Sequence, residues 1–248
     1  LDFCKFTSLM EERYFKINSN SINQNKFSLS KSESYHFINS LRGKLNDKVW
    51  LLDGEGCAYK SIITSINKNL VSGVIKKRVL NYGESSYNIH LVVGLIKGSR
   101  MDFIIEKATE LGVKSIQPII FERCIKKKLN IDRSQRIVES AAKQSGRSYF
   151  PEIFPVSSLD AWISENHSNT NILYHMNGLN YLKNSLNKEN YSYNIIIGPE
   201  GDFSEVELKK LEAIKPATVS LGSRRLRSET SAIVGLANIN QMLKYIDG

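Results

Sequence analysis

The residues beyond about position 88 alternate between short apolar runs and amphipathic stretches, and this alternation constrains the fold more than any other feature. The runs are nearly continuous in apolar residues, as expected of strands that are buried on both faces. Five of them have the length of strands: Ile89–Leu95, Ser115–Phe121, Asn171–Met176, Asn194–Ile197 and Thr218–Leu221. This part of the chain is therefore predicted to be an α/β domain, with a parallel sheet between two layers of helices.

The intervening helices have recognisable ends. The first is predicted to begin with Ser99 as its N-cap and to stop at Gly112, since both residue types favour those positions. A second helix is expected from about Asp132 to Ser145, and the last from about Thr230 to Ile246. Ser204, with Glu207 three residues later, has the spacing of a capping box and predicts a further helix start.

The first third of the chain has a different pattern. It contains short β-rich runs separated by polar or glycine-containing turns, which is typical of a small barrel or sandwich. The runs are Tyr14–Ile17, Lys48–Leu52, Tyr59–Ile66 and Leu70–Leu80, with one helical stretch at Glu33–Leu41. The polar cluster Asn81–Ser86 marks the predicted boundary, so that residues 10–83 and 84–248 are expected to form two domains.

Charge and cysteine content narrow the functional class. The 34 lysines and arginines exceed the 25 acidic residues, which gives a net charge of +9 over 248 residues. Such a surplus indicates a polyanionic partner such as RNA or DNA, although a basic surface that serves only solubility is the alternative. Three widely separated cysteines indicate a reducing compartment, and no apolar run approaches the ~20 residues that cross a bilayer.

The segment from Ile195 to Glu205 joins a predicted strand to a predicted helix through Gly198, Pro199, Glu200, Gly201 and Asp202. The carboxyl end of a parallel strand is where α/β proteins bind ligands. Glycines permit close approach of the backbone, but two carboxylates and the lack of a lysine exclude a phosphate cradle. The alternative is a tight connection without a ligand.

A second strand-to-helix loop runs from Ser220 to Ser231 and contains Gly222 and three arginines, at positions 224, 225 and 227. The arginines either form a solvated basic face or recognise a phosphate or the carbonyls of a base. Two such loops from separate strands could line one pocket.

Other chemical signals are weaker. Lys97–Met101 and Ala141–Arg147 place cations near loops, and Lys126–Lys128 is a basic run that is either solvated or faces RNA. The four histidines, at 36, 90, 167 and 175, lack metal-ligand spacing, so we expect no metal. No nucleophile motif is present, which leaves a hydrolase without support.

Taken together, six segments resemble the RsmE-type methyltransferases of the SPOUT superfamily. They occur in the order of that family and span nearly the whole chain from about position 10. They are His36–Arg42, Lys97–Met101, Glu106–Gly112, Ala141–Arg147, Gly198–Glu205 and Leu221–Thr230. Asp202, Arg225 and Ser231 depart from the pattern, because the family usually has glycine, an aliphatic residue and alanine there.

The resemblance implies a PUA-like β-barrel followed by a SPOUT-type α/β domain with a C-terminal trefoil knot. It further implies a cytoplasmic homodimer that methylates N3 of a uridine in 16S ribosomal RNA of the small subunit, with S-adenosyl-L-methionine as cofactor. The residues expected to bind the cofactor are Leu173, Ile197, Gly198, Pro199, Glu200, Gly201, Ser220, Leu221, Gly222 and Leu226.

Methylation of uridine N3 requires loss of a proton and stabilisation of the charge that spreads onto the carbonyl oxygens. Glu200 or Glu229 is therefore a candidate base, and Arg227 is the candidate cation. The candidates for contacts with the RNA backbone are Arg13, Arg100, Lys143 and Arg147. The alternatives are a non-catalytic RNA-binding or ribosome-assembly protein with this fold, or a SPOUT methyltransferase that acts on another RNA site.

Overall fold

The computed structural model describes residues 12–165, 170–187 and 189–247. Residues 10 and 11 of the predicted first domain, and His167, lie outside the described residues. The chain divides into two compact units, one formed by residues up to 84 together with 142–149, the other by 85–141 and 150–248. No helix among the described residues is long and apolar enough to cross a membrane.

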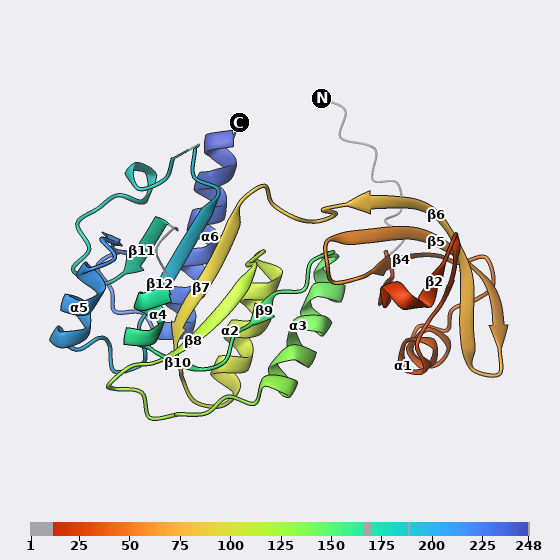
Figure 1. Ribbon diagram of the computed structural model, residues 1–248, viewed down its shortest axis with the longest axis horizontal. Helices are drawn as coiled ribbons and strands as arrows, with labels where there is room; N and C mark the ends of the chain where they lie inside the picture. Colours follow the sequence, from red (N-terminus) through yellow and green to blue (C-terminus); the bar gives the residue numbers. More distant parts are fainter. Residues whose placement is uncertain (1–11, 166–169, 188, 248) are drawn as a thin grey trace. The chain divides into compact units, whose positions relative to one another are not determined.

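The first unit contains one six-stranded sheet in the order β1-β4-β5-β6-β3-β2 (Figure 1). The strands are β1 (Tyr14–Lys16), β2 (Ile22–Asn23), β3 (Lys26–Ser28), β4 (Lys48–Leu52), β5 (Cys57–Asn67) and β6 (Leu70–Leu80). Only the β1–β4 pair is parallel. The predicted helical stretch is present as α1 (Lys31–Tyr35) followed by a π-helical turn, His36–Ser40.

The core of this unit is aromatic and β-branched. Phe15, Phe37, Leu51 and Ile63 are fully buried, and the rings of Phe15 and Phe37 meet edge to face with centroids 5.7 Å apart. Leu51 of β4 and Ile63 of β5 face this core from the sheet, and Phe15 of β1 and Phe37 of the π-helical turn pack in the same cluster.

Residues 142–149 belong to the first unit although the sequence pattern assigns them to the second domain. The reason is a buried ion pair: the Arg147 guanidinium donates to Glu84 Oε2 at 2.7 Å, with side chains only 3% and 1% exposed. Backbone bonds add to it, because Ser148 N donates to the Tyr82 carbonyl at 3.1 Å and Gly56 N donates to the Ser148 carbonyl at 3.0 Å.

The second unit is built on a wholly parallel sheet in the order β10-β8-β7-β12-β11-β13, with β9 beside β8. Its strands are β7 (Asn88–Gly94), β8 (Ser115–Ile120), β9 (Glu152–Ile153), β10 (Ser157–Ser158), β11 (Thr170–Tyr174), β12 (Ser192–Ile197) and β13 (Ala217–Val219). All five predicted strands are confirmed. The short strands β9 and β10 had no apolar run that would have predicted them.

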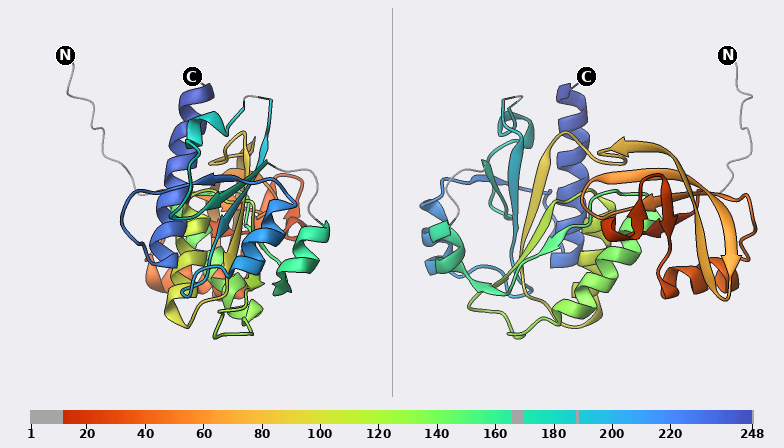
Figure 2. Two further views of the ribbon diagram at one scale, coloured as in Figure 1. Left: turned by 90° about the vertical axis from the view of Figure 1, so that its left-hand side faces the viewer. Right: turned by 45° about the vertical axis from the view of Figure 1, so that its right-hand side comes forward.

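Helices cover both faces of this sheet (Figure 2). They are α2 (Ser99–Glu110), α3 (Ile131–Ser145), α4 (Leu159–Glu165), α5 (Glu205–Glu212) and α6 (Ser228–Asp247). Helices α2 and α6 pack against each other on one side, and α4 and α5 pack against each other on the other. The α/β prediction is therefore confirmed.

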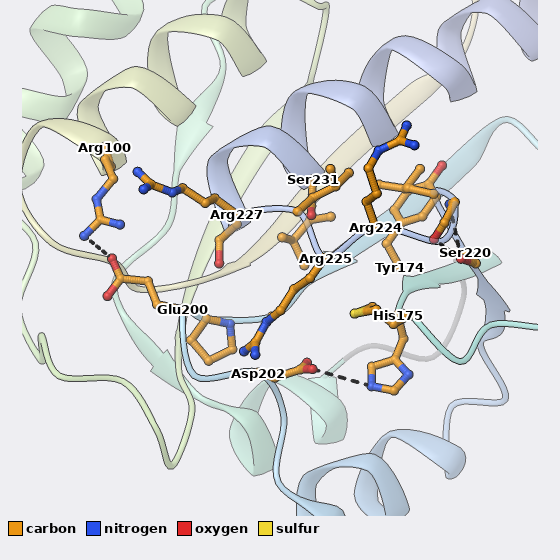
Figure 3. A pocket seen from close by; sticks show the side chains of 18 residues that line it. Arg100, Tyr174, His175, Glu200, Asp202, Ser220, Arg224, Arg225, Arg227 and Ser231 are labelled. Atoms are coloured by element: carbon orange, nitrogen blue, oxygen red, sulfur yellow. Dashed lines mark hydrogen bonds and ion pairs between the residues drawn. The ribbon is translucent and has the colours of Figure 1, made fainter.

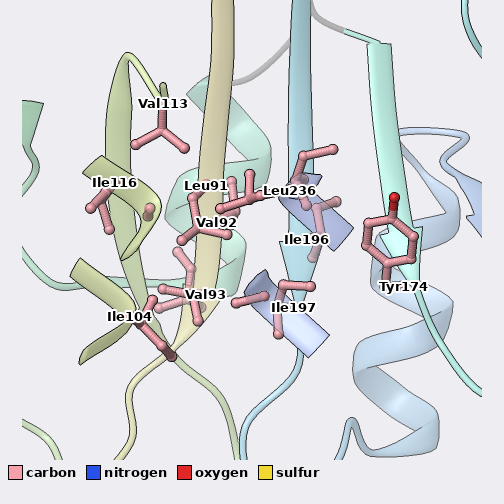
Figure 4. Close-up of a cluster of buried hydrophobic side chains, with 14 of the residues drawn as sticks. Leu91, Val92, Val93, Ile104, Val113, Ile116, Tyr174, Ile196, Ile197 and Leu236 are labelled. Atoms are coloured by element: carbon pink, nitrogen blue, oxygen red, sulfur yellow. The ribbon is translucent and has the colours of Figure 1, made fainter. Parts of the chain in front are cut away.

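Burial on both faces explains the continuous apolar composition of the central strands. Leu91, Val92 and Val93 of β7 are at most 1% exposed, and they align with Ile195, Ile196 and Ile197 of β12. Figure 4 shows these strands together with Ile104 of α2 and Leu236 of α6, which belong to the same hydrophobic core.

Two helix ends test the capping predictions. Ser204 caps α5 in a complete capping box with Glu207, as predicted. The N-cap of α2 is Gly98 rather than Ser99, with φ 55° and no side-chain cap. The turn that leads into α2 requires a positive φ at the N-cap, which glycine adopts most readily. The cap is therefore Gly98, one residue before the predicted Ser99.

Helix α6 returns from β13, at one edge of the sheet, to lie against β12 and β7 in its centre. The trefoil knot expected at this crossing stays a prediction.

Candidate active site

Three neighbouring parallel strands, β12, β11 and β13, end at the same edge of the sheet, and the segments that follow them enclose a cavity of about 670 Å³. Residues 174–176 begin at the last residue of β11, residues 197–202 begin at the last residue of β12, and residues 220–228 lead from β13 into α6. Arg100 of α2 and Ser231 of α6 complete the lining (Figure 3). A pocket at the carboxyl edge of a parallel sheet is the position at which α/β proteins bind ligands.

The 198–202 wall is a tight turn held from two sides. Asp202 N donates to the Pro199 carbonyl at 3.0 Å, and Asp202 itself has φ 63°. On the outer side, Arg123 donates to the Gly201 carbonyl at 2.9 Å. On the inner side, Gly94 at the end of β7 lets Pro199 approach so closely that a Cβ at position 94 would lie 2.6 Å from the Pro199 nitrogen.

The 220–228 wall is held by hydrogen bonds within the loop. The Ser220 hydroxyl accepts from Gly222 N at 3.2 Å and donates to the Gly222 carbonyl at 3.1 Å. Gly222 has φ 116°, which only glycine adopts without strain. The loop then enters α6, whose Gly235 packs against the Tyr174 ring; the Tyr174 hydroxyl donates to the Gly235 carbonyl at 3.2 Å. Burial raises the pKa of Tyr174, so this phenol stays neutral.

The charges in the cavity are mainly positive. Arg100, Arg224, Arg225 and Arg227 line it, against the carboxylates of Glu200 and Asp202 and the ring of His175. Arg100 forms an ion pair with Glu200, and His175 Nε2 lies 3.9 Å from Asp202 Oδ2. In Figure 3 the Arg225 side chain extends toward Asp202, whereas Arg227 lies on the side of Arg100 and Glu200.

Most predicted site residues meet in this cavity. Those that line it are Ile197, Gly198, Pro199, Glu200, Ser220, Leu221, Gly222, Leu226 and Arg227, together with Arg100, which was expected to contact RNA.

Three predicted residues do not line the cavity. Leu173 is 3% exposed and packs in the core around β11, and Gly201 is turned toward Arg123. Glu229 lies in the first turn of α6, where one of its carboxylate oxygens is buried without a hydrogen-bond partner among the described residues.

The remaining candidates for RNA contacts lie in the first unit. Arg13 pairs with Asp47 at 2.9 Å, and Lys143 pairs with Glu33 at 2.6 Å. Arg147 is 2% exposed and is bound by Glu84, so its charge is matched inside the protein. This burial speaks against a contact of Arg147 with the RNA backbone, which stays a prediction.

Sequence reasoning missed part of the cavity. Tyr174, His175 and Met176, the last residues of the third predicted strand, line it, and Ser228 lines it at the start of α6. The position of Tyr174–Met176 at a strand's carboxyl end was a usable signal, but this segment has no glycine or arginine cluster to attract attention.

The chemistry available here is binding and electrostatics. Glycine-rich backbone and apolar side chains can hold a flat, largely uncharged group, and the guanidinium groups can stabilise negative charge. Among the residues that the structure describes, no group of His, Cys, Asp or Glu side chains could hold a metal ion.

The family comparisons fit this geometry. Residues 83–240 match the family described as an RNA methyltransferase domain, and residues 29–76 match an RNA methyltransferase PUA domain. A ribosomal RNA small subunit methyltransferase E of Rickettsia conorii is 31% identical over 231 residues, covering 90% of this chain and 93% of the relative. The Bacillus subtilis protein of the same name is 27% identical over 237 residues, covering 90% and 92%.

A crystal structure of a ribosomal RNA small subunit methyltransferase E from Neisseria gonorrhoeae, bound to S-adenosyl methionine, has a TM-score of 0.85 and 30% identity. The similarity covers 93% of this chain and 98% of that one. The fold and the matched domains place the chain among the α/β RNA methyltransferase domains that carry a PUA domain. It belongs to the ribosomal RNA small subunit methyltransferase E family, which confirms the resemblance read from the sequence.

Proposed function

We propose that this protein transfers a methyl group from S-adenosyl-L-methionine to N3 of a uridine in 16S ribosomal RNA of the small subunit. The observation that carries the proposal is the cavity itself. This chain belongs to the family, and its two glycine-containing loops, with three arginines from the second loop, surround one pocket at the carboxyl edge of the sheet.

The cavity fits the cofactor in size and chemistry. Its volume of about 670 Å³ falls within the range of roughly 300–1,000 Å³ typical of small-molecule sites. Ile197, Leu221 and Leu226 offer apolar contacts for an adenine, and Gly198 and Gly222 bring backbone without side chains to the cavity lining. Asp202 and Arg225 can take the ammonium and carboxylate of the amino-acid end.

When bound, S-adenosyl-L-methionine supplies a methyl group on a sulfonium sulfur that is already activated for transfer. The protein must align uridine N3 with that methyl group and exclude water, and positioning of this kind contributes several kcal/mol. Uridine N3 carries a proton and is a poor nucleophile until the proton is removed. To enter the cavity, the target uridine must also be unpaired and splayed out of the RNA.

Glu200 is the better supported of the two candidate bases, because it lines the cavity and Glu229 does not. The ion pair with Arg100 orients the Glu200 carboxylate toward the same side as Arg227. In this arrangement Glu200 accepts the N3 proton, and Arg227 stabilises the negative charge that develops on the carbonyl oxygens beside N3. Glu229 supports the start of α6 near Arg227.

The first unit, which contains the PUA match, is proposed to help bind the ribosomal RNA, with Arg13 and Lys143 as candidate backbone contacts. Both are partly exposed and both already have a carboxylate partner, so an RNA phosphate would have to compete with Asp47 or Glu33. Because these contacts are made between cations and phosphates, the affinity for RNA should fall steeply with added salt.

We further propose that the protein acts in the cytoplasm as a homodimer. Large apolar side chains are exposed at the end of the cavity segment 174–176 and just beyond it: Met176, Leu179 and Tyr181 are 47%, 92% and 71% exposed. Such a patch is typical of an interaction surface. Analytical ultracentrifugation should give the mass of a dimer, and Leu179→Glu should shift it toward the monomer; a monomeric wild type would refute this point.

The central experiment incubates the protein with small ribosomal subunits that lack the modification and with labelled S-adenosyl-L-methionine, and then maps the methyl group. Label on N3 of one uridine is the expected result. Label on another atom or another RNA would indicate a different methyltransferase. Binding of S-adenosyl-L-methionine without any transfer to subunits or free ribosomal RNA would contradict the proposed reaction.

Single-turnover pH profiles assign the base. Glu200→Gln should lower the rate and remove the rise of rate with pH that proton removal by a carboxylate produces, whereas Glu229→Gln should keep the shape of the profile. Unchanged profiles in both variants would remove the carboxylate base from the mechanism.

A further inference from the structure

A second, smaller cavity of about 210 Å³ lies in the second unit, between the first turns of α2 and α3 and the chain that precedes α3. Its lining includes Gly98 and Ser99 at the start of α2, Lys126 and Asn130 before α3, and Ser134 in its first turn. None of these residues has a role in the reaction proposed above.

The two helix ends at this cavity differ in how their backbone N–H groups are satisfied. Asn130 caps α3, because its side chain accepts from Arg133 N at 3.0 Å and its carbonyl from Ser134 N at 3.0 Å. Helix α2 has no side-chain cap. A Cβ built on its N-cap Gly98 would meet no atom within 4 Å, so there is open space beside the residue that begins this helix. An uncapped helix start of this kind attracts an anion.

A buried hydroxyl points to a ligand independently of the helix end. Ser134 is only 1% exposed and lines this cavity, yet its Oγ has no hydrogen-bond partner among the described residues. A hydroxyl left without a partner in the interior costs about 1–3 kcal/mol, so such groups are nearly always satisfied in native proteins. An oxyanion in the cavity would accept the hydrogen bond that Ser134 lacks.

The charges around the cavity favour an anion. Lys126 and Arg133 line it, and one carboxylate, that of Asp102, does so as well. Asp102 would repel an anion, but its Oδ2 accepts from Arg133 at 2.8 Å, which offsets its charge. Lys126 has no ion pair in the described part of the chain and leaves the cavity with a net positive charge.

We propose that this cavity binds a backbone phosphate of the substrate RNA, held by Lys126, by the Ser134 hydroxyl and by the first N–H groups of α2. The inference rests on the proposed function for the identity of the polyanion. Its position supports it: Ser99 lines the phosphate cavity, while the next residue, Arg100, lines the active-site cavity and pairs with Glu200. One turn of α2 would therefore link a bound phosphate to the site of the target base and fix the register of the RNA.

The test measures binding of a fluorescein-labelled 16S ribosomal RNA fragment to the protein with both of its units, between 50 mM and 200 mM salt, in parallel for two variants. Lys126→Gln removes the proposed contact, and Lys127→Gln removes the same charge from the neighbouring, exposed residue that does not line the cavity. Each phosphate contact accounts for an about threefold loss of RNA affinity between 50 mM and 200 mM salt, so a variant that lacks one contact should lose about threefold less affinity over this range than the wild type. We expect that reduction for Lys126→Gln only.

Ser134→Ala separates a ligand role from a structural one. Removing a hydroxyl that has no partner should leave the melting temperature of the free protein unchanged or raise it. The same change should weaken RNA binding several-fold, without altering the salt dependence or the affinity for S-adenosyl-L-methionine. A structural role would instead lower the melting temperature and leave RNA affinity unchanged.

Equal effects of Lys126→Gln and Lys127→Gln would overturn the proposal, since the basic run would then act only through its general field. Inorganic phosphate distinguishes the source of the anion. If millimolar phosphate stabilises the wild type but not Ser134→Ala, and RNA binds both proteins equally, the cavity takes a free anion and not the RNA backbone. Failure of the proposed reaction is seen separately, because RNA binding is measured without methyl transfer.

Discussion

Gly94 is the residue whose substitution tests most directly how the sheet shapes the cofactor site. A Cβ at this position would lie 2.6 Å from the Pro199 nitrogen and 2.8 Å from its Cα. Ordinary van der Waals contact begins at 3.4 Å, so Gly94→Ala requires the end of β7 and the 198–202 turn to separate by roughly 0.8 Å. The obstacle is backbone on both sides, and no side-chain rotation can relieve it.

The expected cost is about 1–3 kcal/mol of folding stability, which is typical of overpacking a buried site. If the 198–202 turn moves to relieve the strain, Pro199 and Glu200 leave their positions, and a displacement approaching 1 Å can lower a reaction rate about 100-fold. Urea unfolding measures the first effect, and calorimetric titration of S-adenosyl-L-methionine together with single-turnover methylation measures the second. We expect cofactor affinity to fall roughly tenfold, equivalent to about 1.4 kcal/mol.

Gly73→Ala is the matched control. A Cβ at Gly73 of β6 would collide with the Ile62 carbonyl oxygen and the Phe27 ring, so the same substitution overpacks the first unit. It should lower stability by a similar amount while leaving cofactor affinity unchanged. Equal affinities for S-adenosyl-L-methionine in the two folded variants would refute the reasoning that Gly94 positions the cavity wall.

Four further predictions concern single side chains. Arg227→Ala should lower the single-turnover rate about 100- to 1,000-fold with little change in cofactor affinity, and abolished affinity in a calorimetric titration would assign Arg227 to cofactor binding. Burial lowers the pKa of His90, so the unfolded chain binds a proton at this residue at a higher pH than the folded protein does. The free energy of unfolding should therefore fall as the pH drops below about 6.5, by at most ~1.4 kcal/mol per pH unit. His90→Gln should flatten this dependence in urea titrations at pH 5 to 7.5. Asp202→Gly should be nearly neutral in thermal unfolding and Asp202→Ala destabilising by about 1 kcal/mol, because φ is 63°; equal melting temperatures would argue against strain at this turn. Glu84→Gln should cost about 3–5 kcal/mol by leaving the buried Arg147 uncompensated, and a loss below 1 kcal/mol in urea unfolding would show that the pair is not a main support of the first unit.

The elements that the sequence predicts well are those whose signal is local. The central strands were found because burial on both faces leaves nearly uninterrupted apolar runs, as in β7 and β12. The start of α5 was found because Ser204 and Glu207 form their capping box within four residues. Both glycine loops were identified for the same reason.

What the sequence could not predict depends on partners that are distant along the chain. Arg147 looks like a surface cation until Glu84, 63 residues away, is seen to bind it. Leu173 was expected at the cofactor, but its position on β11 places it in the core. His175 and Met176 reach the cavity only because β11 lies between β12 and β13, an order that no local pattern reveals.

The order of the strands also determines when the cavity can exist. Its walls come from residues 174–176, 197–202 and 220–231, and the last wall is fixed only when α6 has packed back against β7 and β12. A chain emerging from a ribosome can form β7, β8 and their helices early, but it has no complete cavity until the segment that forms α6 is synthesised. Cofactor binding is thus a late event in the folding of this protein, and retention of S-adenosyl-L-methionine reports that the C-terminal helix has reached its place.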